Sequence, residues 1–165
     1  LPDTYRLVAR CGEEHAMKKE AVIIIADDDE GHASLIRKNL RRAGLTNEIL
    51  HFKDGIETVE FLFDSENGPK RGSGDAFVLL LDIRMPKMDG VEVLRRVRTD
   101  DDLRGMPVIM ITTTDDPREI QKCHELGCNN YLSKPIDYDK FVRSIRQLGL
   151  FLLVVEIPTL RKNAG

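Results

Sequence analysis

Residues 21–30 have the sequence Ala-Val-Ile-Ile-Ile-Ala-Asp-Asp-Asp-Glu, in which an unbroken apolar run passes into four acids. A run rich in β-branched residues predicts a strand that is buried on both faces, as in a parallel sheet. The four acids then fall at the carboxyl end of that strand, where open parallel sheets carry their functional groups. This one stretch therefore predicts both a fold class and the edge of the sheet at which function is expected.

Strand and helix patterns alternate along the rest of the chain. The sequence predicts further strands over residues 48–52, 77–81, 107–111 and 130–133, of which 77–81 is a continuous apolar run. Apolar residues spaced three or four apart predict a helix after each strand, the last of them ending near residue 150. Residues 64–76, rich in Gly, Ser and charge, predict a surface loop. With right-handed crossovers, this order predicts an α/β fold, a doubly wound (βα)5 three-layer sandwich with a parallel sheet.

Composition narrows the class of protein. The 165 residues carry a net charge of −3, which argues against a nucleic-acid partner held by a broadly basic surface. No apolar run is long enough to span a membrane, so no membrane association is expected. The three cysteines, Cys11, Cys123 and Cys128, fit reduced thiols in a cytoplasmic protein and have no zinc-binding partners at the usual spacing.

The patterning also divides the chain. Residues 1–19 show no clean helical or strand periodicity and are expected to be a disordered arm. The part ahead of Met17 could instead be a tag or the result of a mis-assigned start. The alternative is a genuine arm that docks on the domain. Residues 20–150 form the expected domain. Residues 151–165 form a C-terminal extension, too short for a further output domain.

Four groups are expected to meet at the carboxyl edge of the sheet. Asp27 and Asp28 follow the first strand, Asp82 follows the third, Thr112 ends the fourth and Lys134 follows the fifth. Carboxylates this close repel one another unless a cation intervenes, and a set of hard oxygen ligands suits Mg²⁺. A carboxylate nucleophile with a divalent cation, an ammonium and a hydroxyl makes a site for a small phosphoryl group.

Each feature taken alone has a simpler explanation. Acids at the start of a helix stabilise its dipole, an Asp after a strand often caps a helix, and threonines at a strand end often do the same. A single Lys-Pro pair carries almost no information. The joint occurrence of all four features, each at the carboxyl end of the expected strand, is what favours the phosphoryl site.

At these residues the chain resembles the receiver domain of two-component response regulators. The resemblance spans roughly residues 20–150 and rests on four stretches: Val22-Ile-Ile-Ile-Ala-Asp-Asp-Asp29, Leu79-Leu-Leu-Asp-Ile-Arg-Met-Pro-Lys-Met-Asp-Gly90, Ile109-Met-Ile-Thr-Thr113 and Tyr131-Leu-Ser-Lys-Pro135. It implies a flavodoxin-like sheet of order 2-1-3-4-5. It also implies that Asp82 accepts a phosphoryl group from a sensor histidine kinase or a phosphotransfer protein, in a protein that is not an enzyme acting on other substrates.

The resemblance also implies individual roles. Asp28 and Asp82 would bind Mg²⁺, Asp27 would hold a metal-bound water, and Arg84 would contribute its backbone carbonyl. Lys134 would pair with the phosphoryl oxygens, and its bond to Pro135 would be cis. Thr112 and Tyr131 would form the switch that reorients when Asp82 is modified.

Three weaker sequence features indicate which proteins the chain binds. The loop 64–76, the Thr112-Thr113 pair and the extension 150–158 are similar to single-domain regulators paired with phytochrome-type kinases. Such a regulator would act on a downstream protein target. The apolar residues 150–155 predict a homodimer through this segment, because one helix face cannot bury them all. The alternative is that the segment folds back over the first and last helices.

Two rival classes share part of the pattern. An aspartyl-nucleophile phosphatase of the haloacid-dehalogenase type also has an Asp after a buried strand, but it needs a second acid where this chain has Arg84. A receiver-like binding module with an unused pocket normally lacks Asp82, Lys134 or one of the acids, and all of these are present here. A nucleotide-binding Rossmann domain is excluded because no Gly-rich motif follows the first strand.

Overall fold

The computed structural model describes residues 21–64, 66, 68, 76–155 and 157–158. The expectations for residues 1–19, most of those for the loop 64–76 and those for residues 159–165 lie outside the described residues. No helix within these described ranges is long and apolar enough to cross a membrane.

Five parallel strands form one sheet with the order β2-β1-β3-β4-β5, which confirms the expected topology. The strands are β1 (Val22–Ala26), β2 (Ile49–Phe52), β3 (Phe77–Leu81), β4 (Val108–Thr112) and β5 (Asn130–Ser133). The central strands β3 and β4 are buried along their whole length, as their continuous apolar sequences predict.

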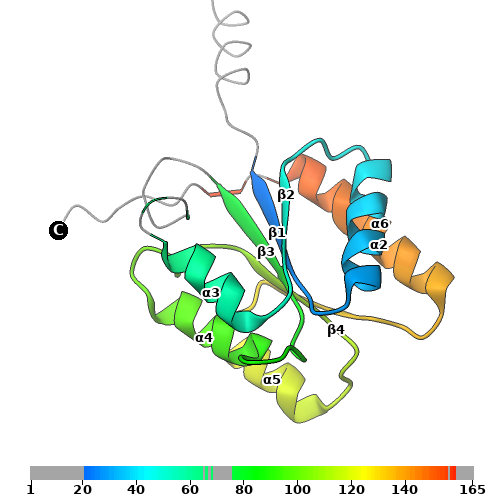
Figure 1. Ribbon diagram of the computed structural model, residues 1–165. Coiled ribbons are helices and arrows are strands. Elements are labelled where there is room, and N and C mark those ends of the chain that lie inside the picture. Colours follow the sequence, from blue (N-terminus) through cyan, green and yellow to red (C-terminus); the bar gives the residue numbers. More distant parts are fainter. Residues whose placement is uncertain (1–20, 65, 67, 69–75, 156, 159–165) are drawn as a thin grey trace, which may run out of the picture.

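Five helices cover the two faces of the sheet, which gives the three layers seen in Figure 1. They are α2 (Glu30–Arg42), α3 (Gly55–Phe63), α4 (Gly90–Thr99), α5 (Pro117–Glu125) and α6 (Tyr138–Val154). In Figure 1, α2 and α6 lie on one face of the sheet and α3, α4 and α5 on the other. Two buried clusters correspond to these faces: one includes Ile36 of α2 and Ile145 of α6, and the other includes Leu62 of α3 and Leu94 of α4.

Each of these helices begins after an aspartate whose side chain accepts a backbone N–H of the first turn. These N-cap residues are Asp29, Asp54, Asp89, Asp116 and Asp137. An N-cap carboxylate satisfies a donor that the helix leaves unpaired and also stabilises the helix dipole. Each cap also fixes where the loop from a strand end into the next helix finishes.

Two expectations need correction. The last helix extends to Val154, beyond the expected end near residue 150, so it contains part of the segment assigned to the extension. The helix continues because Leu152 is buried and Gly149 packs closely on Ala43, the C-cap residue of α2. The expected cis bond between Lys134 and Pro135 is wrong, since no peptide bond of the described residues is cis. An X–Pro bond ordinarily prefers the trans form by about 0.5–1 kcal/mol.

Candidate functional site

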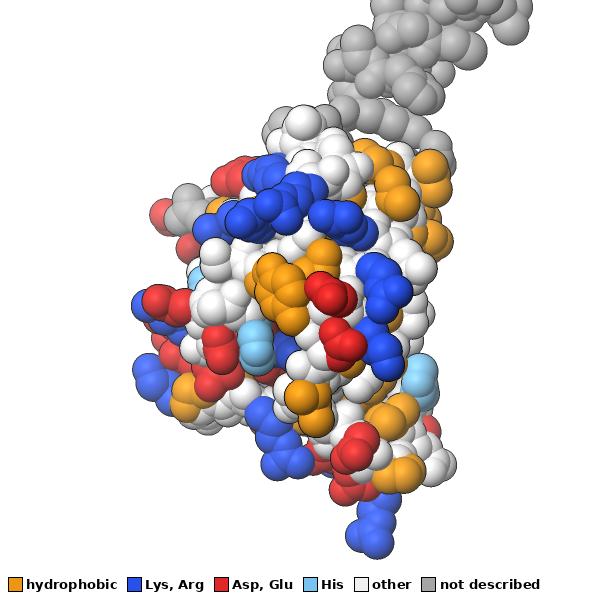
Figure 2. All heavy atoms as spheres, turned by 90° about the vertical axis from the view of Figure 1, so that its right-hand side faces the viewer, with side chains coloured by type: hydrophobic (Ala, Val, Ile, Leu, Met, Phe, Trp, Pro, Cys, Tyr) orange, Lys and Arg blue, Asp and Glu red, His pale blue; other side chains and the backbone are white. Residues whose placement is uncertain are grey.

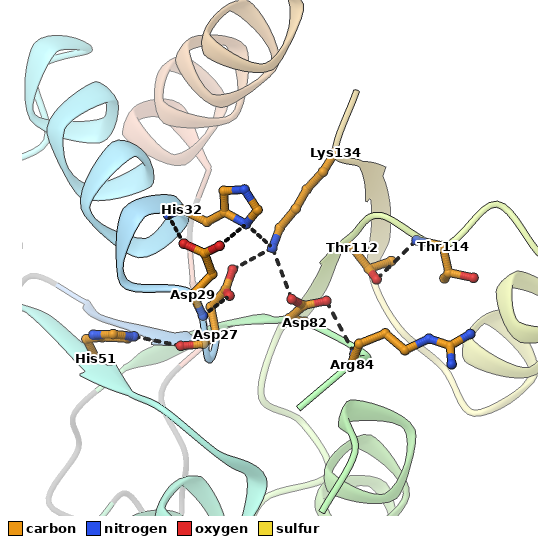
Figure 3. A network of polar contacts seen from close by, with 9 residues as sticks. All are labelled: Asp27, Asp29, His32, His51, Asp82, Arg84, Thr112, Thr114 and Lys134. Atoms are coloured by element: carbon orange, nitrogen blue, oxygen red, sulfur yellow. Dashed lines mark hydrogen bonds and ion pairs between the residues drawn. The ribbon is translucent and has the colours of Figure 1, made fainter. Parts of the chain in front are cut away.

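Lys134 lies at the centre of the polar cluster at the carboxyl edge of the sheet (Figure 3). Its Nζ atom is 2.6 Å from Oδ2 of Asp27 and 3.0 Å from Oδ2 of Asp82. Asp27 follows β1, Asp82 follows β3 and Lys134 follows β5, and all three side chains are buried. The predicted convergence of these residues is therefore present, and the ammonium compensates the charge of two buried carboxylates.

Three carboxylates stand close enough to share one cation. Asp27, Asp28 and Asp82 each offer an oxygen, and these oxygens all lie within 4.8 Å of one another. Burial raises the pKa of Asp27, and the hydrogen bond from Lys134 only partly offsets that effect. A divalent cation would favour the ionised form, and an all-oxygen set that is exposed only at Asp28 suits Mg²⁺ with retained waters. The residues present thus fit a magnesium ion.

The backbone around Asp27 is held from two sides. Nε2 of His51, at the end of β2, donates a hydrogen bond to the carbonyl of Asp27 at 2.8 Å. The backbone N–H of Asp29 donates to Oδ1 of Asp27 at 2.9 Å. These bonds leave the Oδ2 atom of Asp27 for Lys134, so the orientation of this carboxylate is set before any ligand binds.

The loop between β3 and α4 is packed tightly against its neighbours. A Cβ atom on Gly90 would lie 2.0 Å from the carbonyl oxygen of Asp82, and one on Gly55 would lie 2.1 Å from that of Met88. Lys87, which has a left-handed backbone (φ 66°), pairs through Nζ with Asp54 at 3.3 Å. Only glycine allows these two close approaches, so they fix the loop that carries Asp82.

The two expected switch residues lie beside the site without touching Asp82. The Thr112 side chain is buried, and its hydroxyl accepts a weak hydrogen bond from the N–H of Thr114 at 3.4 Å. The hydroxyl of Tyr131 donates to the carbonyl of Thr114 at 3.1 Å. Burial raises the pKa of Tyr131 to about 12, so this phenol remains a donor at neutral pH. Both residues therefore contact the same short loop after β4.

The side chain of Arg84 turns away from Asp82, as Figure 3 shows. Its Nη2 atom donates to both carboxylate oxygens of Glu119 in the first turn of α5, at 3.1 and 3.2 Å. Glu119 also accepts a 2.7 Å hydrogen bond from the hydroxyl of Thr114. The backbone N–H of Arg84 is 3.4 Å from Oδ1 of Asp82. The expected role of the Arg84 carbonyl as a metal ligand stays a prediction.

Sequence reasoning missed three residues of this region. Glu119 reads as a capping acid at the third helical position, yet its side chain binds Arg84 and Thr114. His32 and His51 read as scattered histidines, yet both reach the site. The position of His32, four residues after Asp28 in the helix that starts at the site, was the one available signal. It is too common a spacing to decide anything by itself.

The fold and the site together define a doubly wound α/β domain with three carboxylates and a lysine at the carboxyl edge of its sheet, and comparison with known families identifies the class. Residues 23–146 match the family model of the response regulator receiver domain. The chain belongs to this family and is a receiver-domain response regulator of two-component signalling.

Three relatives illustrate the similarity. A solved response regulator receiver domain from Rhodospirillum rubrum is 44% identical with a TM-score of 0.80, covering 86% of this chain and 99% of its own. Response regulator Rcp1 from Synechocystis is 28% identical, over 83% of this chain and 92% of Rcp1. An Mn²⁺-bound structure of Rcp1 has a TM-score of 0.75 and covers 84% of this chain and 99% of its own at 27% identity. The bacteriophytochrome response regulator RtBRR is 34% identical with a TM-score of 0.65, covering 85% of this chain and 84% of its own.

Proposed function

We propose that the chain accepts a phosphoryl group on Asp82 from a sensor histidine kinase or a phosphotransfer protein, in a reaction that needs Mg²⁺. The observation that carries the proposal is the meeting of Asp82 with Lys134 and with the carboxylates of Asp27 and Asp28. The relative Rcp1 has an Mn²⁺-bound form, which supports the proposal that this chain also binds a divalent cation. Histidine kinases draw phosphate from ATP, so the cytoplasm is the compartment in which we expect the reaction.

In this reaction a carboxylate oxygen of Asp82 attacks phosphorus, and the bond from phosphorus to the donor breaks in line with the new one. Lys134 donates N–H groups to the phosphoryl oxygens and balances charge that grows there. Asp27, Asp28 and Asp82 would hold Mg²⁺, which would supply further neutralisation of the phosphoryl charge. Because Lys134 already bonds Asp82, its ammonium needs little rearrangement to follow the phosphoryl group.

The aspartyl phosphate is then sensed through Thr112 and Tyr131. The phosphoryl group adds charge and acceptor oxygens, which attract the Thr112 hydroxyl away from its weak bond to Thr114. A movement of the loop after β4 changes the surroundings of Tyr131, because this side chain is bonded to Thr114. The coupled movement changes the face formed by α5, β5 and α6, where we place the contact with a downstream protein.

Two finer proposals concern partners. The similarity to the bacteriophytochrome response regulator RtBRR supports a phytochrome-type kinase as phosphodonor.

We also propose a homodimer through the end of α6. Four apolar side chains there are between 48% and 81% exposed: Leu150, Phe151, Leu153 and Val154. Figure 2 views the side of the molecule that carries α2 and α6 and shows hydrophobic side chains exposed among Lys and Arg. Burying these four side chains against a second copy would remove apolar surface from water.

Beryllofluoride, which mimics a phosphoryl group on a carboxylate, tests this function without a kinase. We expect ¹⁹F NMR signals of bound beryllofluoride with the parent protein and Mg²⁺. We expect none with Asp82→Asn or when Mg²⁺ is replaced by EDTA. Bound beryllofluoride in Asp82→Asn would place the acceptor elsewhere, and no binding to the parent would favour a receiver-like module whose pocket is unused.

A further inference from the structure

His32 lies in the first turn of α2, half-buried beside the ammonium of Lys134 (Figure 3). Its Nδ1 atom is 3.2 Å from Nζ of Lys134 and 3.7 Å from Oδ2 of Asp29. The imidazole ring also stands edge-on to the ring of Phe141 in α6, with 6.1 Å between ring centroids. The ring is thus confined between two helices with one nitrogen aimed into the site.

The chemistry of Lys134 fixes the role of that nitrogen. An ammonium has three N–H donors and no acceptor. The bonds to Asp27 and Asp82 use two of these donors, and the third points to Nδ1 of His32. Nδ1 can accept this N–H only with a free lone pair, which is the neutral tautomer that carries its proton on Nε2.

We propose that His32 is a positioning residue for Lys134, which holds the ammonium in the orientation that phosphoryl transfer to Asp82 requires. The proposal rests on the phosphoryl transfer proposed above. With two acceptors the ammonium is free to turn about the axis between them, whereas a third acceptor fixes all its N–H directions. When a phosphoryl group replaces the free carboxylate of Asp82, the bonds to Asp27 and His32 keep the remaining N–H aimed at it.

The same nitrogen has a second, mutually exclusive partner. A protonated imidazole would carry a hydrogen on Nδ1, lose the bond from Lys134 and turn this hydrogen toward Asp29. Asp29 is suited to that partner because the backbone N–H of His32 lowers the pKa of its carboxyl. The titratable groups facing His32 are Asp29 from the helix cap and Lys134 from the loop after β5, while α6 presents the non-titrating Phe141. Nδ1 can therefore serve Lys134 as an acceptor or Asp29 as a donor, but not both.

The test compares rate constants for phosphorylation by acetyl phosphate at saturating Mg²⁺, followed by intact mass. Leucine at this position removes the acceptor, so we expect His32→Leu to be slower by about 2- to 10-fold, the usual net effect of one hydrogen bond. Asparagine places an oxygen near the position of Nδ1 and does not titrate, so His32→Asn should recover most of the rate. Ser34→Leu, an exposed change in the same helix, is the matched control and should react like the parent.

Rescue by asparagine separates positioning from general damage to the fold, provided that both variants melt at the parental temperature. A rate for His32→Leu equal to the parent rate would overturn the proposal. So would a His32→Asn as slow as His32→Leu.

A second measurement keeps the two proposals distinguishable. ¹⁵N NMR of the imidazole in the unmodified protein at neutral pH should report an unprotonated Nδ1 and a protonated Nε2. A proton on Nδ1 would refute the positioning role whether or not the protein accepts phosphate. If the tautomer is as expected but neither parent nor variants gain a phosphoryl group, the proposed function fails instead.

Discussion

Arg84 and Glu119 join the loop that carries the candidate phosphoacceptor to the first turn of α5. Nη2 of Arg84 donates to both oxygens of Glu119, and Glu119 in turn accepts from the hydroxyl of the buried Thr114. Arg84 stands two residues after Asp82, and Thr114 two residues after Thr112. One carboxylate therefore joins the loop that follows β3 to the loop that follows β4.

Glu119→Gln should lengthen the life of the aspartyl phosphate. The change releases Arg84, and a free guanidinium can pair with the phosphoryl dianion and hinder its hydrolysis, in which water bonds phosphorus and the carboxylate of Asp82 leaves. We expect a half-life longer by about 2- to 10-fold, measured by intact mass after acetyl phosphate is removed. Glu125→Gln in the last turn of the same helix is the control. If Glu119→Gln lengthened the half-life of the aspartyl phosphate equally in a protein that already carries Arg84→Gln, this account would be contradicted, because no guanidinium is then available at residue 84.

Tyr131→Ala should separate phosphorylation from its consequences. The phenol is bonded to the carbonyl of Thr114 and does not touch Asp82, so Asp82 should gain its phosphoryl group at the parental rate. The response of the loop after β4 and of α5 should shrink, because the coupling through Thr114 is lost. Amide chemical shifts with and without beryllofluoride measure this response, and Tyr131→Phe isolates the hydroxyl. Full parental shifts in Tyr131→Ala would show that Tyr131 does not couple the site to α5.

Phe151→Glu should weaken self-association. Phe151 is 55% exposed in the last turns of α6, and a charge there would be buried at the proposed dimer contact. Sedimentation at high micromolar concentration should report a dimer for the parent and more monomer for the variant. Gln147→Glu, an exposed change on the same helix that adds the same charge, should stay dimeric. A parent that sediments only as a monomer would refute the dimer.

Glu92 should contribute stability that acid removes. Hydrogen bonds from Arg95 and Arg96 lower the pKa of Glu92 from its ordinary value of 4.5 to about 2. A carboxyl with a lowered folded-state pKa stabilises the protein above its unfolded pKa, and this stability is lost as pH falls from about 4.5 to about 2. Glu92→Gln should therefore be less stable than the parent near pH 7, by less than about 1 kcal/mol because the pairs are on the surface. Urea unfolding should find the two proteins converging near pH 2; an unchanged gap there would exclude the ion pairs as its cause.

Much of the fold was predictable because local signals agree with the global arrangement. The continuous apolar run over 77–81 coincides with β3, and the short strand predicted over 130–133 coincides with β5. Asp116-Pro117 begins α5 as the capping signals indicate. The end of α6 was not predictable, because the apolar residues after Gly149 contain no stop signal and the helix is held there by packing on α2. Local sequence patterns do not predict a tertiary contact of this kind.

The candidate site was predictable to the extent that it lies at strand ends. Asp27, Asp82 and Lys134 each follow a recognisable strand, so the parallel order of the strands brings them together. The partners of Glu119 and His32 were not predictable, since they depend on how loops far apart in the chain approach one another. The sequence pattern assigns Glu119 a capping role, and only the position of Arg84 reveals the other one.

Phosphorylation of Asp82 itself is tested most directly by intact mass after incubation with acetyl phosphate and Mg²⁺. The account predicts a gain of one phosphoryl group in the parent and no gain in Asp82→Asn or in EDTA, since the nucleophile or the cation is then missing. Lys134→Met, which removes the ammonium bonded to Asp82, should slow the gain strongly. A phosphoryl group that persists in Asp82→Asn would contradict the assignment of the acceptor. No gain in the parent, together with no binding of beryllofluoride, would contradict the proposed function as a whole.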